Sequence, residues 1–204
     1  VRWLRWLSPT AMWRGDHNEK SIYLTFDDGP IPQATPFILD TLAKYGVKAT
    51  FFVVGDNVRK FPDLFERIIS EGHKVGNHTY HHISGYKHSI STYINDVKKA
   101  DEYVHSHLFR PPYGWMKPEQ RIWITQHYKI IMWDVITRDY SKRMRPDNVR
   151  TQTVNQISVI INRASVYGDN TFNVNPAQSR KVSVCVFGNY VNRKSRKPKR
   201  SILL

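Results

Sequence analysis

The chain has 204 residues, which is enough for one domain with a sizeable core and short for two. Hydrophobic residues make up 40% and aromatic residues 13%, a composition typical of a globular rather than a disordered protein. Cys185 is the single cysteine, so an internal disulfide and a cysteine-based metal site are both excluded. Any metal ion must therefore be held by histidine and carboxylate side chains.

The net charge of +14 suggests a nucleic-acid binder, but the charge is unevenly distributed. Residues 141–204 hold 13 of the 31 Lys and Arg and only two of the 17 acidic residues, so residues 1–140 are nearly balanced. The basic run at 192–204 has no interleaved aromatic residues and no recognition motif. Salt-dependent binding to nucleic acid or another anionic surface is therefore the last of the functions we consider, and we expect no specific nucleic-acid partner.

The N-terminal segment, residues 1–20, begins with the basic and aromatic stretch VRWLRWLSPTAMW. Arg2 and Arg5 interrupt it, no apolar run in the chain is long enough to cross a bilayer, and no signal peptide is seen. Three interpretations stay open: an amphipathic surface segment, the remnant of an anchor, or a strand or turn packed on the rim of the domain.

Strands and helices are predicted to alternate through the first two thirds of the chain. Strands are expected at residues 21–26, 47–54, 73–78, 108–110 and 128–135, and helices at 35–45, 61–71, 90–104 and 119–127. This alternation favours parallel strands joined by helical crossovers, either as an open sheet or as a barrel. After Tyr140 the periodicity weakens, although Val182–Phe187 is still a candidate strand.

Three polar clusters follow predicted strands. The first, TFDDGP at 25–30, places Asp27 and Asp28 side by side at a strand end, where one carboxylate could bind a metal and the other could act as a base. Taken alone, a turn that ends a strand is the commoner interpretation of an Asp-Gly pair.

The second cluster, NHTYHH at 77–82, contains His78 and His82 four positions apart. This spacing places both imidazoles on one face of a helical turn, where they could grip one divalent ion, although ordinary histidines are an equally good interpretation of an isolated pair. His81 is expected to be structural or to face solvent.

The third cluster, RPPYG at 110–114, follows a short strand with an arginine and a rigid proline corner. Arg110 could hold a carboxylate in place, but a surface turn is the simpler interpretation of this motif alone. Combined, the clusters provide one Asp and two His as metal ligands, a second Asp as base and an Arg to keep it ionised. That set suits attack of water on the carbonyl of an amide or ester.

Residues from about 15 to 150 resemble the NodB-homology polysaccharide deacetylases, carbohydrate esterase family 4. The resemblance rests on TFDDGP at 25–30, NHTYHH at 77–82, RPPYG at 110–114 and WDVITRDY at 133–140. It implies an α/β fold, a distorted (β/α) barrel, and removal of acetyl groups from acetylated glycans such as N-acetylglucosamine polymers or O-acetylated polysaccharide. It also implies action at the cell envelope, outside the cytoplasm, and we expect a monomer with a domain at 21–150.

The resemblance also implies a role for each motif residue. Asp27 is expected to be the catalytic base, Arg110 its orienting partner, and the backbone N–H of Tyr113 a donor to the oxyanion. Asp139 matches the carboxylate that tunes a general-acid histidine in the family. The metal ligands are expected to be Asp28, His78 and His82, with Zn²⁺ as the preferred ion and Co²⁺, Ni²⁺ or Mn²⁺ as alternatives.

The chain departs from the family at its end, because none of its nine histidines follows Tyr140. The family's last motif is a strand ending in the histidine that protonates the leaving group. Two hypotheses arise for the atypical basic segment 151–204: an aberrant sequence that replaces the last strand and helix, or a divergent lineage with another acid or without catalysis. The alternative function is therefore a catalytically impaired protein that binds metal and glycan.

Overall fold

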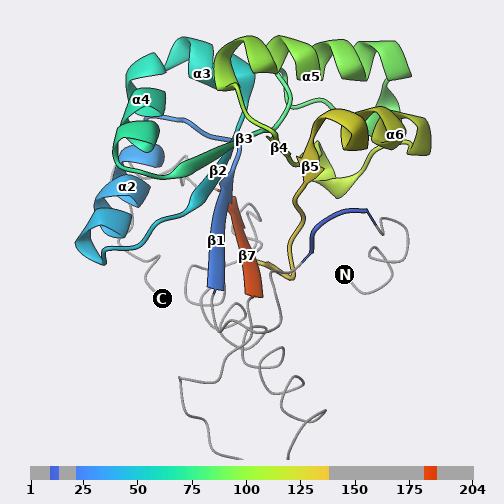
Figure 1. Cartoon of the computed structure of the whole chain (residues 1–204). Helices are drawn as coiled ribbons and strands as arrows, with labels where there is room; N and C mark the ends of the chain where they lie inside the picture. The colour runs from blue at the N-terminus through green and yellow to red at the C-terminus, as the bar shows by residue number, and fades with distance from the viewer. Residues whose placement is uncertain (1–9, 14–21, 138–181, 188–204) are drawn as a thin grey trace, which may run out of the picture.

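The computed structural model describes residues 10–13, 22–137 and 182–187 (Figure 1). Its strands form one sheet of seven parallel strands in the order β5-β4-β3-β2-β1-β7-β6. The strands are β1 (Ile22–Asp27), β2 (Thr50–Val53), β3 (Lys74–Asn77), β4 (Leu108–Phe109), β5 (Lys129–Ile130), β6 (Val135–Ile136) and β7 (Val182–Phe187). The helices are α2 (Thr35–Lys44), α3 (Gly55–Lys60), α4 (Pro62–Ser70), α5 (Ile90–Val104) and α6 (Pro118–His127), with 3₁₀ turns η1 (Gly85–Lys87) and η2 (Pro112–Gly114).

The sheet is curled, because the segment that joins its two edge strands is too short to span a flat sheet. Strands β5 and β6 lie at opposite ends of the strand order, yet only residues 131–134 separate them. A chain that extends about 3.6 Å per residue covers about 18 Å between Ile130 and Val135. A flat sheet with strands about 4.8 Å apart would separate its two edges by about 29 Å. The edges must therefore approach each other, which confirms the predicted distorted (β/α) barrel.

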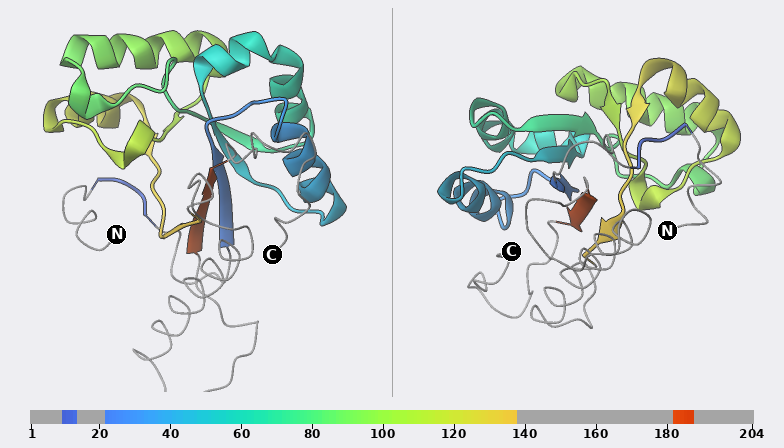
Figure 2. Two further views of the ribbon diagram at one scale, coloured as in Figure 1. Left: turned by 180° about the vertical axis from the view of Figure 1, so that it is seen from behind. Right: turned by 60° about the horizontal axis from the view of Figure 1, so that its bottom comes forward.

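The helices cover the outer side of one part of the curled sheet (Figures 1 and 2). Helices α2 to α6 form an arc around β2 to β5, while β1 and β7 stand side by side away from α5 and α6. Six residue pairs join β1 to β7, from Ile22 with Val182 to Asp27 with Phe187. The candidate strand near the C-terminal end is thus confirmed, and it extends the sheet beside β1.

Two apolar clusters fill the spaces between helices and sheet. The cluster on the side of α2 and α4 includes the buried residues Leu39, Phe51, Val53, Ile68 and Val135. The cluster below α5 and α6 includes Tyr93, Val97, Phe109, Ile124, Ile130, Ala11 and Trp13. Met12 also forms a parallel bridge with Ile131. Residues 11–13 therefore pack beside the segment that follows β5, with a single bridge and no regular strand, in line with the interpretation of this part of the N-terminal segment as packed on the rim.

One prediction of secondary structure is wrong, and one helix is missing from the predicted elements. Residues 128–135 do not form one strand, because β5 pairs with β4 whereas β6 pairs with β7 across the curled sheet. Helix α3 was not predicted, since its six residues are too few to show an apolar period. Helix α5 agrees with its predicted bounds, and its N-cap Ser89 accepts a hydrogen bond from the Thr92 N–H at 3.1 Å.

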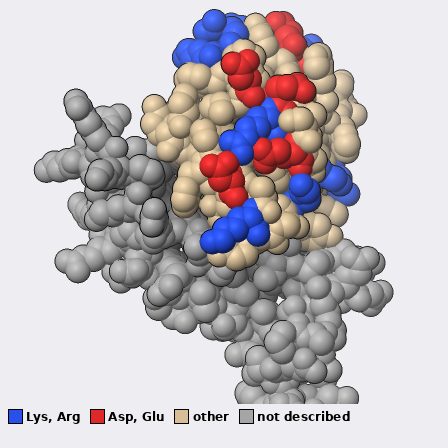
Figure 3. Space-filling model, turned by 90° about the vertical axis from the view of Figure 1, so that its left-hand side faces the viewer, with Lys and Arg blue, Asp and Glu red and all other residues tan. Residues whose placement is uncertain are grey.

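The surface beside α2 to α4 carries both signs of charge in close alternation (Figure 3). Arg67 on α4 pairs with Asp40 on α2 at 2.5 Å and with Glu71 at 2.5 Å. Asp56 pairs with Arg59 at 3.0 Å and also with Lys60. This face is therefore not a basic patch for nucleic acid, in line with the balanced charge of residues 1–140. No helix of the described part combines the length and apolar character needed to cross a bilayer.

Candidate active site

The predicted site residues that the structure describes meet at the carboxyl ends of β1, β3 and β4. Strand register sets Asn77 at the end of β3 opposite Phe109 at the end of β4, so the residues that follow, His78 and Arg110, lie next to each other. Asp27 ends β1, two strands away from β3 in the sheet. Parallel strands present their carboxyl ends at one edge, which is where (β/α) barrels hold their functional groups.

Asp28, His78 and His82 form a group of possible metal ligands. One ligand atom from each lies within 4.8 Å of the others. The Nε2 atoms of His78 and His82 lie 3.3 and 3.0 Å from the same oxygen, Oδ1 of Asp28. One carboxylate and two imidazoles that converge on a point are a ligand set suited to a divalent transition metal, with coordination positions left for water and substrate.

The surroundings of His78 fit a metal ligand. Its side chain is 1% exposed and its Nδ1 lies 2.7 Å from the backbone oxygen of Arg110. A carbonyl oxygen only accepts, so Nδ1 carries the proton and Nε2 presents its lone pair toward Asp28. Nε2 is buried and makes no hydrogen bond within the described residues. A buried nitrogen in this state is costly unless a cation or proton occupies the site.

The same contacts shift the ionisation of the group. Burial opposes ionisation of Asp28, but its close interactions with His78 and His82 outweigh this effect and hold the pKa of Asp28 well below its usual range. Burial alone would lower the pKa of His78, whereas contact with Asp28 and the nearby charge of Asp27 raise it. Both pKa shifts show that this pocket favours an ionised Asp28 next to a positive charge.

Two of the three candidate ligands lie on strained backbone. Asp28 has φ 70° and His82 has φ 54°, in the left-handed region that non-glycine residues rarely adopt. The turn at Asp28 is held by the Asn57 side chain, whose Nδ2 donates to the Asp28 carbonyl oxygen at 2.8 Å. Such conformations cost about 1–3 kcal/mol each and persist only where the surroundings enforce them. They direct the side chains of Asp28 and His82 toward each other.

Asp27 and Arg110 form a buried ion pair next to the candidate metal ligands. Nη1 of Arg110 lies 2.6 Å from Oδ1 of Asp27, and the two side chains are 0% and 1% exposed. Nη1 also donates to Oγ1 of Thr25 at 2.8 Å. Nε and Nη2 donate to the backbone oxygens of Ile131 and Met132 at 3.0 and 3.1 Å. The guanidinium is therefore fixed in one position, with a charge-assisted hydrogen bond to the carboxylate of Asp27.

The cluster RPPYG contributes a turn over the ligands. Tyr113 lies within η2 at φ 61°, and the residue is 62% exposed. The ring lies 4.8 Å from the ring of His82, centroid to centroid. Tyr113 therefore lies beside His82, one of the candidate metal ligands. Asp139, the remaining predicted site residue, lies outside the described residues.

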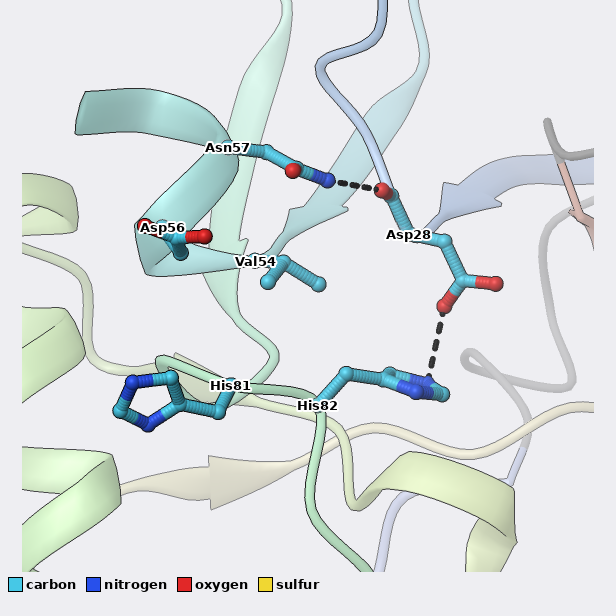
Figure 4. A pocket seen from close by; sticks show the side chains of 6 residues that line it. All are labelled: Asp28, Val54, Asp56, Asn57, His81 and His82. Atoms are coloured by element: carbon cyan, nitrogen blue, oxygen red, sulfur yellow. Dashed lines mark hydrogen bonds and ion pairs between the residues drawn. The ribbon is translucent and has the colours of Figure 1, made fainter. Parts of the chain in front are cut away.

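A polar cavity opens beside the ligands (Figure 4). It has a volume of about 300 Å³ and is lined by Asp28, Val54, Asp56, Asn57, His81 and His82. Asp28 and His82 point toward each other at one end, while the ring of His81 turns away toward the side of Asp56 (Figure 4). Sequence reasoning did not identify Asp56 or Asn57, because they lie on α3, a helix without a recognisable pattern.

Comparisons with known proteins agree with this geometry. A profile of the family described as polysaccharide deacetylase matches residues 14–128. The chain is 42% identical over 133 residues to a peptidoglycan-N-acetylglucosamine deacetylase of Bacillus cereus, an alignment that covers 62% of this chain and 48% of that protein. It is 37% identical over 155 residues to the peptidoglycan-N-acetylmuramic acid deacetylase PdaC of Bacillus subtilis, covering 72% and 33% of the two chains. The chain thus spans about half or less of the length of these relatives.

A solved structure is also similar to this chain, and the similarity extends over most of both chains. The crystal structure of the Bc1960 peptidoglycan N-acetylglucosamine deacetylase, in complex with a hydroxamate-type benzamide, superposes with a TM-score of 0.73 and 30% identity. The match covers 90% of this chain and 79% of that one. The family profile covers more than half of the chain and includes the segments that carry Asp28, His78 and His82. The chain therefore belongs to the polysaccharide deacetylase family.

Proposed function

We propose that this chain is a metal-dependent hydrolase that removes acetyl groups from N-acetylglucosamine polymers, such as peptidoglycan or chitin oligosaccharides. The observation that carries the proposal is the juxtaposition of a metal ligand set, Asp28, His78 and His82, with a buried carboxylate, Asp27, held by Arg110. The names of the relatives, which act on peptidoglycan, support the choice of substrate class.

Asp27 is proposed as the general base. Arg110 holds the Asp27 side chain through a contact of 2.6 Å to Oδ1, and the carboxylate is proposed to accept the proton of the attacking water. The fixed guanidinium limits rotation of the carboxylate, which holds its oxygens in one orientation for proton transfer. Water then adds to the acetyl carbonyl carbon. The tetrahedral intermediate collapses, the C–N bond breaks as the nitrogen takes up a proton, and acetate and the free amine are released, so that the proton gained by Asp27 balances the one delivered to nitrogen.

The metal is proposed to be Zn²⁺, held by Asp28, His78 and His82. When bound, it would act as a Lewis acid that polarises the acetyl carbonyl and lowers the pKa of water. Imidazole and carboxylate ligands suit zinc, while Co²⁺, Ni²⁺ and Mn²⁺ accept the same donors. The hydrogen bond from Nδ1 of His78 to the Arg110 carbonyl orients the imidazole and makes Nε2 a better donor of electron density.

The backbone N–H of Tyr113 is proposed to stabilise the oxyanion. Its place beside His82 puts the η2 turn next to the ligand set, where negative charge develops on the carbonyl oxygen. Asp139 retains its proposed role in tuning a proton donor to the leaving amine. The proton donor itself is not assigned to a residue.

Release of acetate from N-acetylglucosamine oligomers, measured with and without added zinc, tests the proposal. The variant Asp27→Asn keeps the size of the side chain but loses the base, and kcat should fall by about 10²- to 10⁴-fold. Asp63→Asn is the matched control, since it makes the same change at an exposed position on α4. Equal activity of the wild-type chain and Asp27→Asn would refute the role of Asp27.

A second candidate is a metal and glycan binder with impaired turnover. The observation behind it is that all nine histidines lie at or before His127, so residues 141–204 contain no histidine to protonate the leaving amine. Stoichiometric zinc binding and glycan binding without acetate release would favour this candidate. Acetate release that depends on both zinc and Asp27 would exclude it.

A further inference from the structure

A buried carboxylate that belongs to none of the predicted clusters holds the loop between His78 and His82. Asp96 lies on α5 with an 8% exposed side chain. Its Oδ2 accepts the backbone N–H of Tyr80 at 3.0 Å and of His81 at 2.9 Å. Its Oδ1 lies 2.5 Å from Nδ1 of His81. A charge is buried only where donors compensate it, so these contacts fix the loop and the ring of His81 together.

The opposite side of the loop is fixed by α3. The backbone N–H of Gly55 donates to the Thr79 oxygen at 3.0 Å, and the N–H of Asp56 donates to the Tyr80 oxygen at 3.0 Å. A side chain at position 55 could not be accommodated, since a Cβ there would lie 2.7 Å from Cδ2 of Tyr80. The loop is therefore clamped between α3 and α5, and its side chains have little freedom to reorient.

His81 is nevertheless open to ligands. Its side chain is 54% exposed, and it lines the cavity that continues from Asp28 and His82. Its ring points away from the metal ligands, toward the end of the cavity near Asp56 (Figure 4). Because Nδ1 is engaged by Asp96, Nε2 is the ring atom that can reach a ligand. An exposed ring held in place by a buried carboxylate is preorganised for binding, which reduces the entropy lost when a ligand binds.

We propose that His81, oriented by Asp96, is a substrate-binding residue that hydrogen-bonds the glycan unit next to the one being deacetylated. The inference rests on the proposed function and adds a subsite to it. The position of His81 at the far end of the cavity excludes contact with the reacting acetyl group, and the polar lining suits hydroxyl groups. The ligand class is an uncharged, hydroxyl-rich sugar unit of an N-acetylglucosamine oligomer.

The variant His81→Asn tests the contact without releasing the loop. Asparagine presents an amide nitrogen near the position of Nδ1, so the bond to Asp96 can persist while Nε2 is lost. For the N-acetylglucosamine tetramer, KM should rise about fivefold, the effect of one net hydrogen bond, with kcat unchanged. Turnover of 4-nitrophenyl acetate, which has no neighbouring sugar, should not change. His107→Asn is the matched control, at an exposed position outside this cavity.

Calorimetric titration of the tetramer into the zinc-loaded chain measures the same contact without turnover. If the wild-type chain releases no acetate, the proposed function is refuted. Even then, a fivefold weaker Kd of His81→Asn for the tetramer would support the subsite. An unchanged Kd and KM would overturn the role of His81. Equal loss on both substrates would also overturn it, because it would show that His81 acts through the metal ligands.

The orienting role of Asp96 is tested by a double-variant cycle on the tetramer. Asp96→Ala should raise KM at least as much as His81→Asn, and the double variant should raise it no further than Asp96→Ala alone. Additive effects would remove Asp96 from the proposal. A melting temperature measured for each variant separates this result from loss of folded protein.

Discussion

The buried pair of Arg110 and Asp27 allows a quantitative prediction about stability. In Arg110→Met, a side chain of similar length but without charge leaves the carboxylate of Asp27 buried with its main cation removed. Breaking a buried ion pair from one side costs about 3–5 kcal/mol. The backbone oxygens of Ile131 and Met132 lose a donor as well, so the expected loss lies toward the upper end of that range.

Urea denaturation followed by tryptophan fluorescence measures this loss as a change in the free energy of unfolding. The double variant Arg110→Met with Asp27→Leu provides the decisive comparison. It removes the Asp27 carboxylate, which the single variant leaves buried without its cation. It should be more stable than Arg110→Met alone, although it has lost more polar contacts. Arg67→Met is the control: it breaks ion pairs of a side chain that is 35% exposed, where solvent screens the interaction.

A loss below about 1 kcal/mol in Arg110→Met would refute the reasoning, since that value belongs to surface pairs. A double variant that is less stable than the single one would refute it in a different way. It would show that the contacts of Arg110 to the backbone, rather than its charge, dominate the energetics of the pair.

Three further predictions concern metal, packing and pH. Stoichiometric zinc should raise the melting temperature of the wild-type chain but not that of Asp28→Ala, because a ligand stabilises a protein only when the folded state binds it. Equal increases in melting temperature for the two chains would show that the zinc binds elsewhere. Gly76→Ala should lower the free energy of unfolding by about 1–3 kcal/mol in urea titrations, since its Cβ would lie 2.5 Å from the ring of buried Phe52, and an unchanged midpoint would contradict this close contact. Burial, and secondarily Lys48, lowers the pKa of His73, so the stability it contributes should be complete above pH 6.5 and decline as pH falls below that value. His73→Asn, which can still accept the Ala49 N–H, should show a shallower decline in pH-dependent unfolding experiments; identical slopes would exclude His73 as the source.

The sequence allowed accurate prediction where local chemistry determines structure. Helix α5 has a capping serine and an apolar period, and its bounds agree with the prediction. The positions of Asp28, His78 and His82 could be predicted as a group because each follows a strand, and parallel strands end at one edge. The motif alone could not provide the backbone turns at Asp28 and His82, which depend on contacts such as that of Asn57.

Tertiary contacts explain what the sequence could not show. Residues 128–135 are rich enough in apolar residues to suggest one strand. Apolar composition, however, does not reveal which strands this segment will pair with. The carbonyls of Ile131 and Met132 bond to the guanidinium of Arg110 as the chain crosses between the two edges of the sheet. Asp96 was missed for a related reason: a single acid on an amphipathic helix carries no signal that it will meet the backbone of a distant loop.

Arg110 links the two halves of the candidate site through different atoms. Its side chain binds Asp27, the proposed base, while its backbone oxygen accepts from Nδ1 of His78, a proposed metal ligand. The position of β4 beside β3 therefore sets the base and the ligand at the same time, since Arg110 is the first residue after β4 and its N–H donates to the Asn77 oxygen at 3.1 Å. A substitution that shifts this strand should disturb proton transfer and metal affinity together. A substitution of the Arg110 side chain leaves the carbonyl in place and should impair proton transfer more than metal binding.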